Sequence, residues 1–405
     1  MLRRCLLSVF KGPSALGACI VAALLATGPI HAEPGVHPDK VVFGQSAAFE
    51  GPARALGLGM REGILAAFHE VNSAGGVKGR RLELVSYDDG YEPDRAIANT
   101  KRLIHEDEVF ALIGEVGTPT SKAAQPIASD EQVPFIGPFT GAEFLRNPYK
   151  RTVINVRGSY YQETEAMVER LTQDLGITRV AILYQDDSYG RAGLAGVERA
   201  LRQRAMELVA EGTYMRNTIA VKTAVLAIRK GDPEAVIMIG AYKPCAEFIR
   251  VARQIDFDPL FLNVSFVGSK ALAGELGSAG EGVIVTQVVP FPENTTIPLV
   301  AQYQKALKAF NPIAEPGFVS LEGYMVGRLA VKALHELEGA ISREAFLETF
   351  VKVGTFELGG VELTYGPNDN QGMDRVFFTV IQGDGTLRRI DKLETQSIPE
   401  RSAAR

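Results

Sequence analysis

The sequence predicts an α/β protein built as two doubly wound, three-layer lobes. Short apolar runs alternate with amphipathic stretches through most of the chain. Because these runs are apolar throughout, they are typical of parallel strands that helices cover on both faces. The chain is also longer than one compact core usually holds, and its strand-helix rhythm restarts near Arg179, which indicates a second lobe.

The amino end is predicted to be a signal peptide covering residues 1–32. Basic residues up to Lys11 precede an apolar run over 15–26, and a cleavage point lies near Ala32. We therefore expect a soluble protein that is exported to the periplasm. The alternative is a lipoprotein anchored at Cys19, but Lys11 interrupts the apolar run before this cysteine, and the main apolar run follows it.

Charge and cysteine content narrow the classes of function. Residues 1–32 hold three basic and no acidic side chains, so their removal takes the formal charge from -5 to -8. Nucleic acid is therefore not an expected partner. Cys5 and Cys19 leave with the signal peptide, and Cys245 alone cannot form an intramolecular disulfide. The fold must rely on its apolar core.

The strand signals follow one another in a regular order. The apolar runs that we expect to form strands are VVF at 41, LELVSY at 82, FALI at 110, VAILY at 180, AVIMI at 235 and GVIVTQVV at 282. Late helices are expected over 298–310, 318–338 and 342–351, before further β-like pieces.

We expect the chain to cross between the lobes at the segments 152–161 and 288–294, where the strand-helix pattern of one lobe ends and that of the other begins. The resulting division is lobe 1 over 38–155 plus 289–345, lobe 2 over 156–288 plus 346–390, and a polar tail over 391–405.

Two successive strands in the first lobe each run into a loop that carries hydroxyl groups. The run FALIG leads to Gly117 and Thr118, where Pro119 suits a first helical position and Thr118 a cap. Backbone N–H groups and the helix dipole favour a carboxylate at such a turn. The run VPFIG leads in the same way to Phe139 and Thr140. Two adjacent loops of this kind indicate capture of a small anionic ligand, although each alone is also typical of an ordinary capped turn.

The motifs in this order resemble the type I periplasmic solute-binding proteins of ABC transporters, in particular the leucine/isoleucine/valine-binding branch. The similarity runs from about Val41 to about Gly385. The motifs that carry it are NSAGGVKGRRLELVSYDDGYEPDRA, GEVGTPTSKAAQP, GPFTGAEFL, AILYQDDSYGRAG, IMIGAYKPCAEFIRVAR, FLNVSFVGS and ELTYGPNDNQG. The resemblance implies two α/β lobes, three crossings and a ligand clamped in the cleft.

The resemblance also implies which residues bind the ligand. Thr118 stands where the family places a hydroxyl that holds the ligand carboxylate, and Phe139 with Thr140 stands where it uses a loop backbone and a threonine. Tyr189 and Tyr242 match tyrosines that the second lobe contributes to the cleft.

Two further aromatic residues are candidates for the walls of the cleft. Phe49 lies in the first loop, and Tyr160 follows the first crossing.

This chain departs from the family pattern at two places. Ser265 stands where the amino-acid binders have an acidic partner for the ligand's ammonium group. A buried ammonium needs a counter-charge, so either another acid such as Glu115 or Asp187 substitutes, or the ligand has no α-amino group. In addition, Tyr91 and Gly117 stand where some members have the cysteines of a small disulfide.

The enzyme hypothesis finds less support in the residues. Gly57, Gly59 and Gly63 approach a dinucleotide fingerprint, but their spacing and helical position favour close helix packing instead. The histidines are scattered without a metal-ligand spacing, and we interpret Cys245 as structural because no histidine stands near it.

We therefore predict a monomeric binding protein without catalytic residues, cofactor or metal. Its ligand is an amino acid or a related carboxylate or amide, and its partner is an ABC-transporter permease in the membrane. A ligand-sensing partner of a signalling receptor or kinase is the alternative from another class, and an enzyme acting on a small carboxylate is the third hypothesis.

Overall fold

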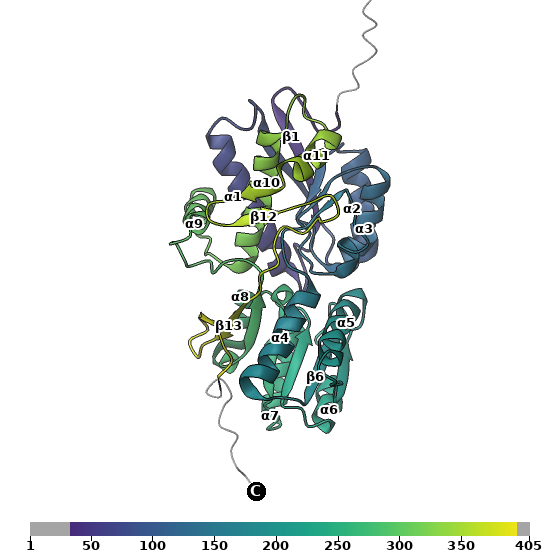
Figure 1. Ribbon diagram of the computed structural model, residues 1–405, viewed down its shortest axis with the longest axis vertical. Helices are drawn as coiled ribbons and strands as arrows, with labels where there is room; N and C mark the ends of the chain where they lie inside the picture. Colours follow the sequence, from purple (N-terminus) through teal and green to yellow (C-terminus); the bar gives the residue numbers. More distant parts are fainter. Residues whose placement is uncertain (1–32, 395–405) are drawn as a thin grey trace, which may run out of the picture. The chain divides into compact units, whose positions relative to one another are not determined.

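The structure is a computed structural model that describes residues 33–394 (Figure 1). The predicted signal peptide, with its cleavage point near Ala32, and the end of the polar tail lie outside the described residues. Among the helices of residues 33–394, none combines the length and apolar character that crossing a membrane requires.

The first lobe is built on a parallel sheet with the strand order β2-β1-β3-β4-β5. Its strands are β1 (Lys40–Ala47), β2 (Arg81–Asp88), β3 (Ala111–Ile113), β4 (Phe135–Ile136) and β5 (Val153–Ile154). The apolar runs predicted these strands because β1 and β3 to β5 are buried almost throughout, whereas β2 at the edge is only half buried. Strand order reverses between β1 and β3, which is where ligands bind in open α/β sheets.

In the described part of the chain, the first lobe contains six α-helices and one short 3-10 helix. They are α1 (Arg54–Ser73), α2 (Pro93–His105), α3 (Thr118–Asp130), α9 (Pro298–Phe310), α10 (Phe318–Glu336) and α11 (Arg343–Val353), with the 3-10 helix η1 (Glu143–Leu145).

The second lobe holds a mixed sheet with the order β14-β13-β10-β9-β8-β6-β7. Its parallel strands are β6 (Val180–Gln185), β7 (Ala210–Tyr214), β8 (Ala235–Ile239), β9 (Leu260–Asn263) and β10 (Ile284–Gln287). Two antiparallel strands, β13 (Phe377–Ile381) and β14 (Leu387–Ile390), extend it beyond β10. The predicted doubly wound α/β class is confirmed, with an antiparallel pair added at one edge.

The helices of the second lobe include α4, which positions part of the candidate site. Ser159 and Gln162 form a reciprocal capping box at its start, which sets the first turn directly after the first crossing. The full set is α4 (Tyr160–Leu175), α5 (Ser188–Arg202), α6 (Lys222–Lys230), α7 (Tyr242–Gln254) and α8 (Ser269–Leu276), with the 3-10 helices η2 (Ser265–Val267) and η3 (Gly277–Gly280).

Helices α1 and α10 lie against each other although they are far apart in the sequence (Figure 1). A Cβ atom on Gly63 would lie 2.0 Å from the carbonyl oxygen of Ser320, and one on Gly57 would lie 2.0 Å from that of Ala48. These glycines therefore permit close packing, as the interpretation of the glycine spacing predicted, and they lie within α1 rather than in a phosphate-binding turn.

We expected the chain to return to the second lobe at residue 346. In the structure it does so later. The Phe346 ring of α11 packs edge-on against Phe110 at 5.4 Å, and Arg343 donates to the carbonyls of Val109 and Phe110. The hairpin of β11 (Thr355–Glu357) and β12 (Glu362–Thr364) follows, with Phe356 against Phe350 of α11. The apolar face of α11 thus holds this segment on the first lobe, and the chain enters the second sheet at β13.

Candidate functional site

Three hydroxyl groups meet where the two predicted ligand loops face the start of α4. The Oγ1 atoms of Thr118 and Thr140 are 2.6 Å apart, and Thr140 Oγ1 donates to Tyr160 Oη at 3.2 Å. All three residues are fully buried. We call Thr118, Thr140 and Tyr160 the hydroxyl cluster. It brings together donors from the carboxyl ends of β3 and β4 and from the first turn of α4.

Backbone pairing holds the two ligand loops side by side. The amide of Phe139 donates to the carbonyl of Glu115 at 2.7 Å, and Gly117 donates to the carbonyl of Phe139 at 3.3 Å. Helix α3 begins at Thr118, so Gly117 occupies the cap position that we expected for Thr118, with φ at 107°. A Cβ atom on Gly117 would lie 2.2 Å from the Tyr91 ring, so a side chain does not fit there.

Aromatic rings from both lobes surround this region. The Phe266 ring lies 4.6 Å from Tyr189, 5.4 Å from Phe139 and 6.1 Å from Tyr91, between ring centroids. Tyr160 lies 5.5 Å from Tyr189. We call these five residues the aromatic cluster. The sequence predicted Phe139, Tyr160 and Tyr189 as ligand-binding residues, but not Phe266 and Tyr91. Phe266 could have been found because it follows Ser265, and Tyr91 because it lies close to the YDD motif.

A buried ion pair lies against the same loops. Arg157 donates from Nε and Nη2 to the two carboxylate oxygens of Glu322, both at 2.8 Å, and its side chain is only 1% exposed. The Arg157 guanidinium lies over the Phe139 ring, 4.1 Å from its centroid. Burial acts to lower the pKa of Arg157, but the Glu322 carboxylate outweighs burial and raises it, so the guanidinium stays charged. Neither residue was predicted from the sequence to bind ligand.

A buried carboxylate occupies the position next to Ser265. Glu163 of α4 accepts hydrogen bonds from the backbone amide of Ser265 at 2.7 Å, from its Oγ at 3.0 Å, and from Thr286 Oγ1. Burial raises the pKa of Glu163, while Arg157 and these hydrogen bonds act to lower it. The acid that contacts Ser265 is therefore Glu163, and not Glu115 or Asp187.

Glu115 lies behind the first ligand loop. Its Oε1 accepts from the amide of Ser46 at 3.3 Å, and Ser46 Oγ donates to Asp89 at 3.0 Å. Burial raises the pKa of Glu115 well above its usual range and that of Asp89 to about 7.

Phe49 and Tyr242 make their contacts near the start of α1 rather than in the hydroxyl cluster. Phe49 is stacked under Arg61, with the guanidinium carbon 4.1 Å from the ring centroid. Tyr242 Oη accepts from the amide of Ala55 at 3.4 Å. Both side chains therefore lie beside the first-lobe helix that borders the site.

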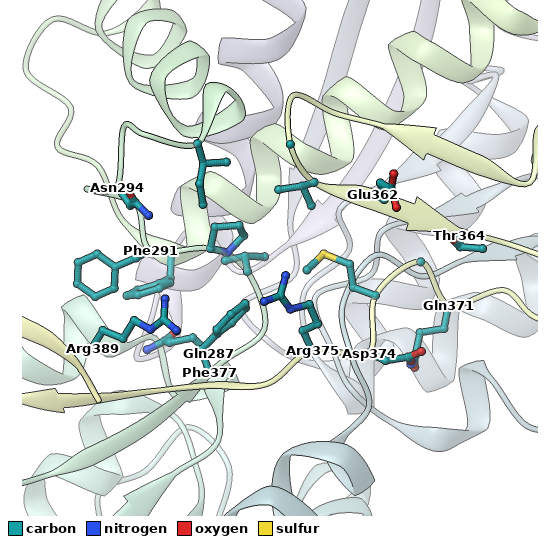
Figure 2. Close-up of a pocket in the computed structure, with 18 of the residues that line it drawn as sticks. Gln287, Phe291, Asn294, Glu362, Thr364, Gln371, Asp374, Arg375, Phe377 and Arg389 are labelled. Carbon is teal, nitrogen blue, oxygen red and sulfur yellow. The ribbon is translucent and has the colours of Figure 1, made fainter. Parts of the chain in front are cut away.

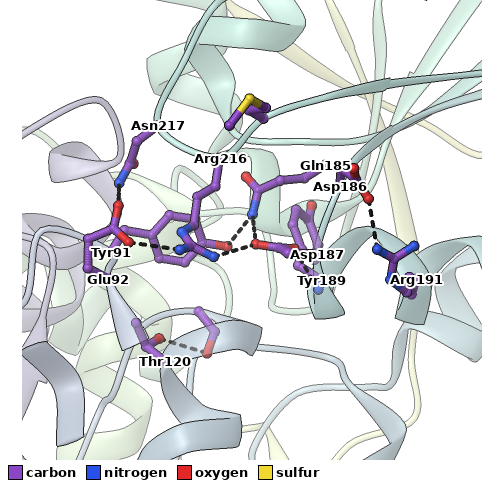
Figure 3. Close-up of polar contacts among 12 residues, drawn as sticks. Tyr91, Glu92, Thr120, Gln185, Asp186, Asp187, Tyr189, Arg191, Arg216 and Asn217 are labelled. Carbon is purple, nitrogen blue, oxygen red and sulfur yellow. Dashed lines mark hydrogen bonds and ion pairs between the residues drawn. The ribbon is translucent and has the colours of Figure 1, made fainter. Parts of the chain in front are cut away.

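Four residues connect the lobes through polar contacts, and Figure 3 shows three of them, Glu92, Arg216 and Asn217. Arg216, which follows β7, forms an ion pair with Glu92 ahead of α2 at 2.8 Å. Asn217 Nδ2 donates to Glu92 Oε1 at 2.7 Å and to the carbonyl of Gly90 at 3.0 Å. We call Gly90, Glu92, Arg216 and Asn217 the interlobe latch. Arg216 also pairs with Asp187 of its own lobe at 3.0 Å.

A separate cavity of about 610 Å³ lies beside the later crossings (Figure 2). It is lined by the segment after β10, by the β11-β12 hairpin and by β13, and the labelled Arg375 and Arg389 point toward it. None of the residues that we predicted to bind ligand lines this cavity.

The described residues offer no assembled metal site and no exposed thiol. Within residues 33–394, histidine, cysteine, aspartate and glutamate side chains do not form a group of three or more that could hold a metal ion. Cys245 is fully buried, and burial raises the pKa of its thiol.

Comparison with known proteins places the chain in a family. The sequence matches the periplasmic binding protein family over residues 40–386. It is 24% identical over 361 residues to Leu/Ile/Val-binding protein homolog 7 of Brucella suis, covering 84% of this chain and 88% of that protein. It is 23% identical to the leucine-, isoleucine-, valine-, threonine-, and alanine-binding protein of Pseudomonas aeruginosa, covering 83% of this chain and 86% of that one.

Solved structures agree with the sequence comparison. The fold is similar to the crystal structure of a possible leucine/isoleucine/valine-binding protein from Rhodopirellula baltica, with a TM-score of 0.84 and 42% sequence identity over 87% of this chain and 96% of that one. Because the family match covers nearly the whole described chain and the fold is two-lobed α/β, the chain is a member of the periplasmic binding protein family.

Proposed function

We propose that this protein captures a small organic ligand carrying a carboxylate or an equivalent acceptor, such as an amino acid or a related acid or amide, between its two lobes. The ligand is then delivered to an ABC-transporter permease in the membrane. The protein acts in the periplasm as a monomer, after removal of the signal peptide near Ala32, and it does not act as an enzyme. The relatives named for binding leucine, isoleucine and valine support this class of ligand.

The observation that carries the proposal is the hydroxyl cluster. Thr118 can donate to Thr140, and Thr140 donates to Tyr160. Tyr160 also shares a side-chain hydrogen bond with Thr118, so the three hydroxyls contact one another and each can rotate its hydrogen toward a ligand oxygen. Several hydroxyl donors gathered in a buried site are suited to a carboxylate, because charge-assisted hydrogen bonds are the strongest of their kind.

The contacts between the lobes support a mechanism of capture by closure. The ligand binds first to the Thr118 and Thr140 loops of the first lobe, and rotation at the crossings then brings Tyr189 of the second lobe over it. The interlobe latch and the aromatic cluster connect residues of both lobes. A closed form that hides the ligand also offers a permease a surface that the open form lacks.

The charges around the site support both an amino acid and a plain acid as ligand. Glu163 supplies the negative charge that Ser265 lacks, and it lies in contact with Ser265. However, three donors already satisfy its oxygens. An α-ammonium group would compete with these donors, whereas a ligand without an amine leaves them in place.

A thermal-shift screen tests the proposal, because a ligand that binds only the folded state raises the melting temperature. The panel contains amino acids, aromatic acids, short carboxylates and amides. We expect at least one carboxylate-bearing compound to raise the melting temperature and to be recovered unchanged after prolonged incubation.

Matched tyrosine variants then locate the site. Tyr160→Phe should weaken binding of that compound by about tenfold or more, since a buried hydrogen bond to a charged group contributes about 1.5–3 kcal/mol. Tyr161→Phe removes the next hydroxyl along the chain, which lies outside the cluster, and should leave the affinity unchanged. Equal affinities for both variants would contradict the site.

A further inference from the structure

The guanidinium of Arg157 holds one buried nitrogen without a partner. Nε and Nη2 both donate to Glu322, but Nη1 has no hydrogen-bond partner among the described residues. The side chain is 1% exposed. A charged buried donor that is left unpaired carries its full desolvation cost, so native proteins nearly always pair such groups.

Arg157 lies in the wall of the proposed ligand site. Its guanidinium carbon is 4.1 Å from the centroid of Phe139, the residue before Thr140. It also precedes Tyr160 by three residues, at the point where the first crossing enters α4. The charge of Arg157 acts on the Tyr160 phenol, whose pKa burial raises and Arg157 lowers. The unpaired nitrogen and the hydroxyl cluster therefore belong to one region.

The surrounding contacts hold Arg157 in one position. The carboxylate of Glu322 in α10 accepts hydrogen bonds from two nitrogens of Arg157. This bidentate pair fixes the plane of the guanidinium. Arg146 donates from Nη2 to the backbone carbonyl of Arg157 at 2.9 Å and to that of Thr140 at 3.4 Å. The arginine backbone is thus tied to the ligand loop, which is the kind of preorganisation that binding sites require.

We infer that Nη1 of Arg157 donates to the carboxylate of the ligand, so that the site prefers a carboxylate over the matching neutral amide. This inference rests on the proposed function and adds a specificity-determining residue to it. The Arg157–Glu322 pair is neutral as a whole, so the preference comes from a directed, charge-assisted hydrogen bond rather than from net positive charge.

The test compares the affinities of carboxylates and their primary amides by calorimetry. The probes are benzoate with benzamide, phenylacetate with phenylacetamide, 4-methylpentanoate with its amide, and L-leucine with L-leucinamide. For the pair that binds, the wild type should prefer the carboxylate at least tenfold. Arg157→Lys keeps the charge beside Glu322 but cannot place a second nitrogen in the site, and the preference should fall to threefold or less while the amide affinity changes little.

A second variant covers the case in which lysine does not allow folding. Replacing both partners, Arg157→Met with Glu322→Leu, removes the buried pair together, a change that proteins often tolerate. It should lower the preference in the same way. Arg151→Lys is the matched control, because Arg151 makes a bidentate pair with Glu344 at the surface, outside the site.

Four results would overturn the inference. An unchanged carboxylate preference in both Arg157 variants would exclude the hydrogen bond from Nη1. A parallel loss of carboxylate and amide binding would show a purely structural role. Absence of binding by every carboxylate in the wild type would overturn the proposed function as well, whereas amide binding equal to carboxylate binding would leave the proposed function standing.

Discussion

The interlobe latch should set the balance between the open and closed forms of the ligand-free protein. Glu92→Ala removes the ion pair with Arg216 at 2.8 Å and the hydrogen bond from Asn217 at 2.7 Å. Arg216 keeps its pair with Asp187 in its own lobe, so no buried cation is abandoned. The change therefore acts mainly on contacts between the lobes.

The magnitude follows from the exposure of the groups. The side chains of Arg216 and Glu92 are 22% and 42% exposed, so solvent screens the ion pair and it contributes about 0.2–1 kcal/mol. The hydrogen bond from Asn217 to a charged group contributes about 1.5 kcal/mol at this partly exposed site. Together these contacts favour closure by about 2 kcal/mol, so the closed-to-open ratio should fall about 30-fold.

Single-molecule fluorescence energy transfer between exposed cysteines introduced on the two lobes measures this ratio. Cys245 is fully buried and will not take up the label in the folded protein. The control is Asp186→Ala, which removes the 2.8 Å pair with Arg191 inside the second lobe. An open population that is the same in Glu92→Ala and wild type, or that rises equally in Asp186→Ala, would refute this reasoning.

Other predictions concern stability and reactivity. Burial raises the pKa of Asp89 to about 7. Between about pH 4 and 7 the folded state therefore holds a proton on Asp89 that the unfolded state has released. As a result, the free energy of unfolding falls as pH rises through this range. Asp89→Asn should therefore flatten the pH dependence of urea unfolding by up to about 1.4 kcal/mol per pH unit, and an unchanged slope would contradict this. Gly63→Ala places a Cβ atom 2.0 Å from the Ser320 carbonyl oxygen, so the urea midpoint should fall by an amount equivalent to at least about 2 kcal/mol, and a wild-type midpoint would disprove the close packing. The Cys245 thiol should resist maleimide until the protein unfolds, and rapid labelling of the folded protein would argue against its burial.

Much of the fold was readable from local patterns. The apolar runs at 41, 110, 180 and 235 predicted buried parallel strands, because only strands covered on both faces need apolar residues throughout. The placement of α11 was less accessible. Its contact with Phe110 depends on how Phe346 fits against a residue far away in the sequence, and a local pattern does not contain that information.

The candidate site could be predicted only where loops carry their own signals. Thr118 and Tyr160 lie at helix starts, Thr140 lies in the loop after β4, and the structure brings their hydroxyl groups together. Glu163 contacts Ser265 across 102 sequence positions. In the sequence it is one more acid on an amphipathic helix, so only the tertiary structure can pair the two.

We propose that the ligand lies between the lobes with its carboxylate at the hydroxyl cluster. A crystal structure of the protein with the most stabilising carboxylate from the screen tests this most directly. We expect ligand density enclosed by the aromatic cluster, with a carboxylate oxygen within hydrogen-bonding distance of Tyr160 Oη. Density in the cavity beside Arg375 and Arg389, with an empty hydroxyl cluster, would contradict it.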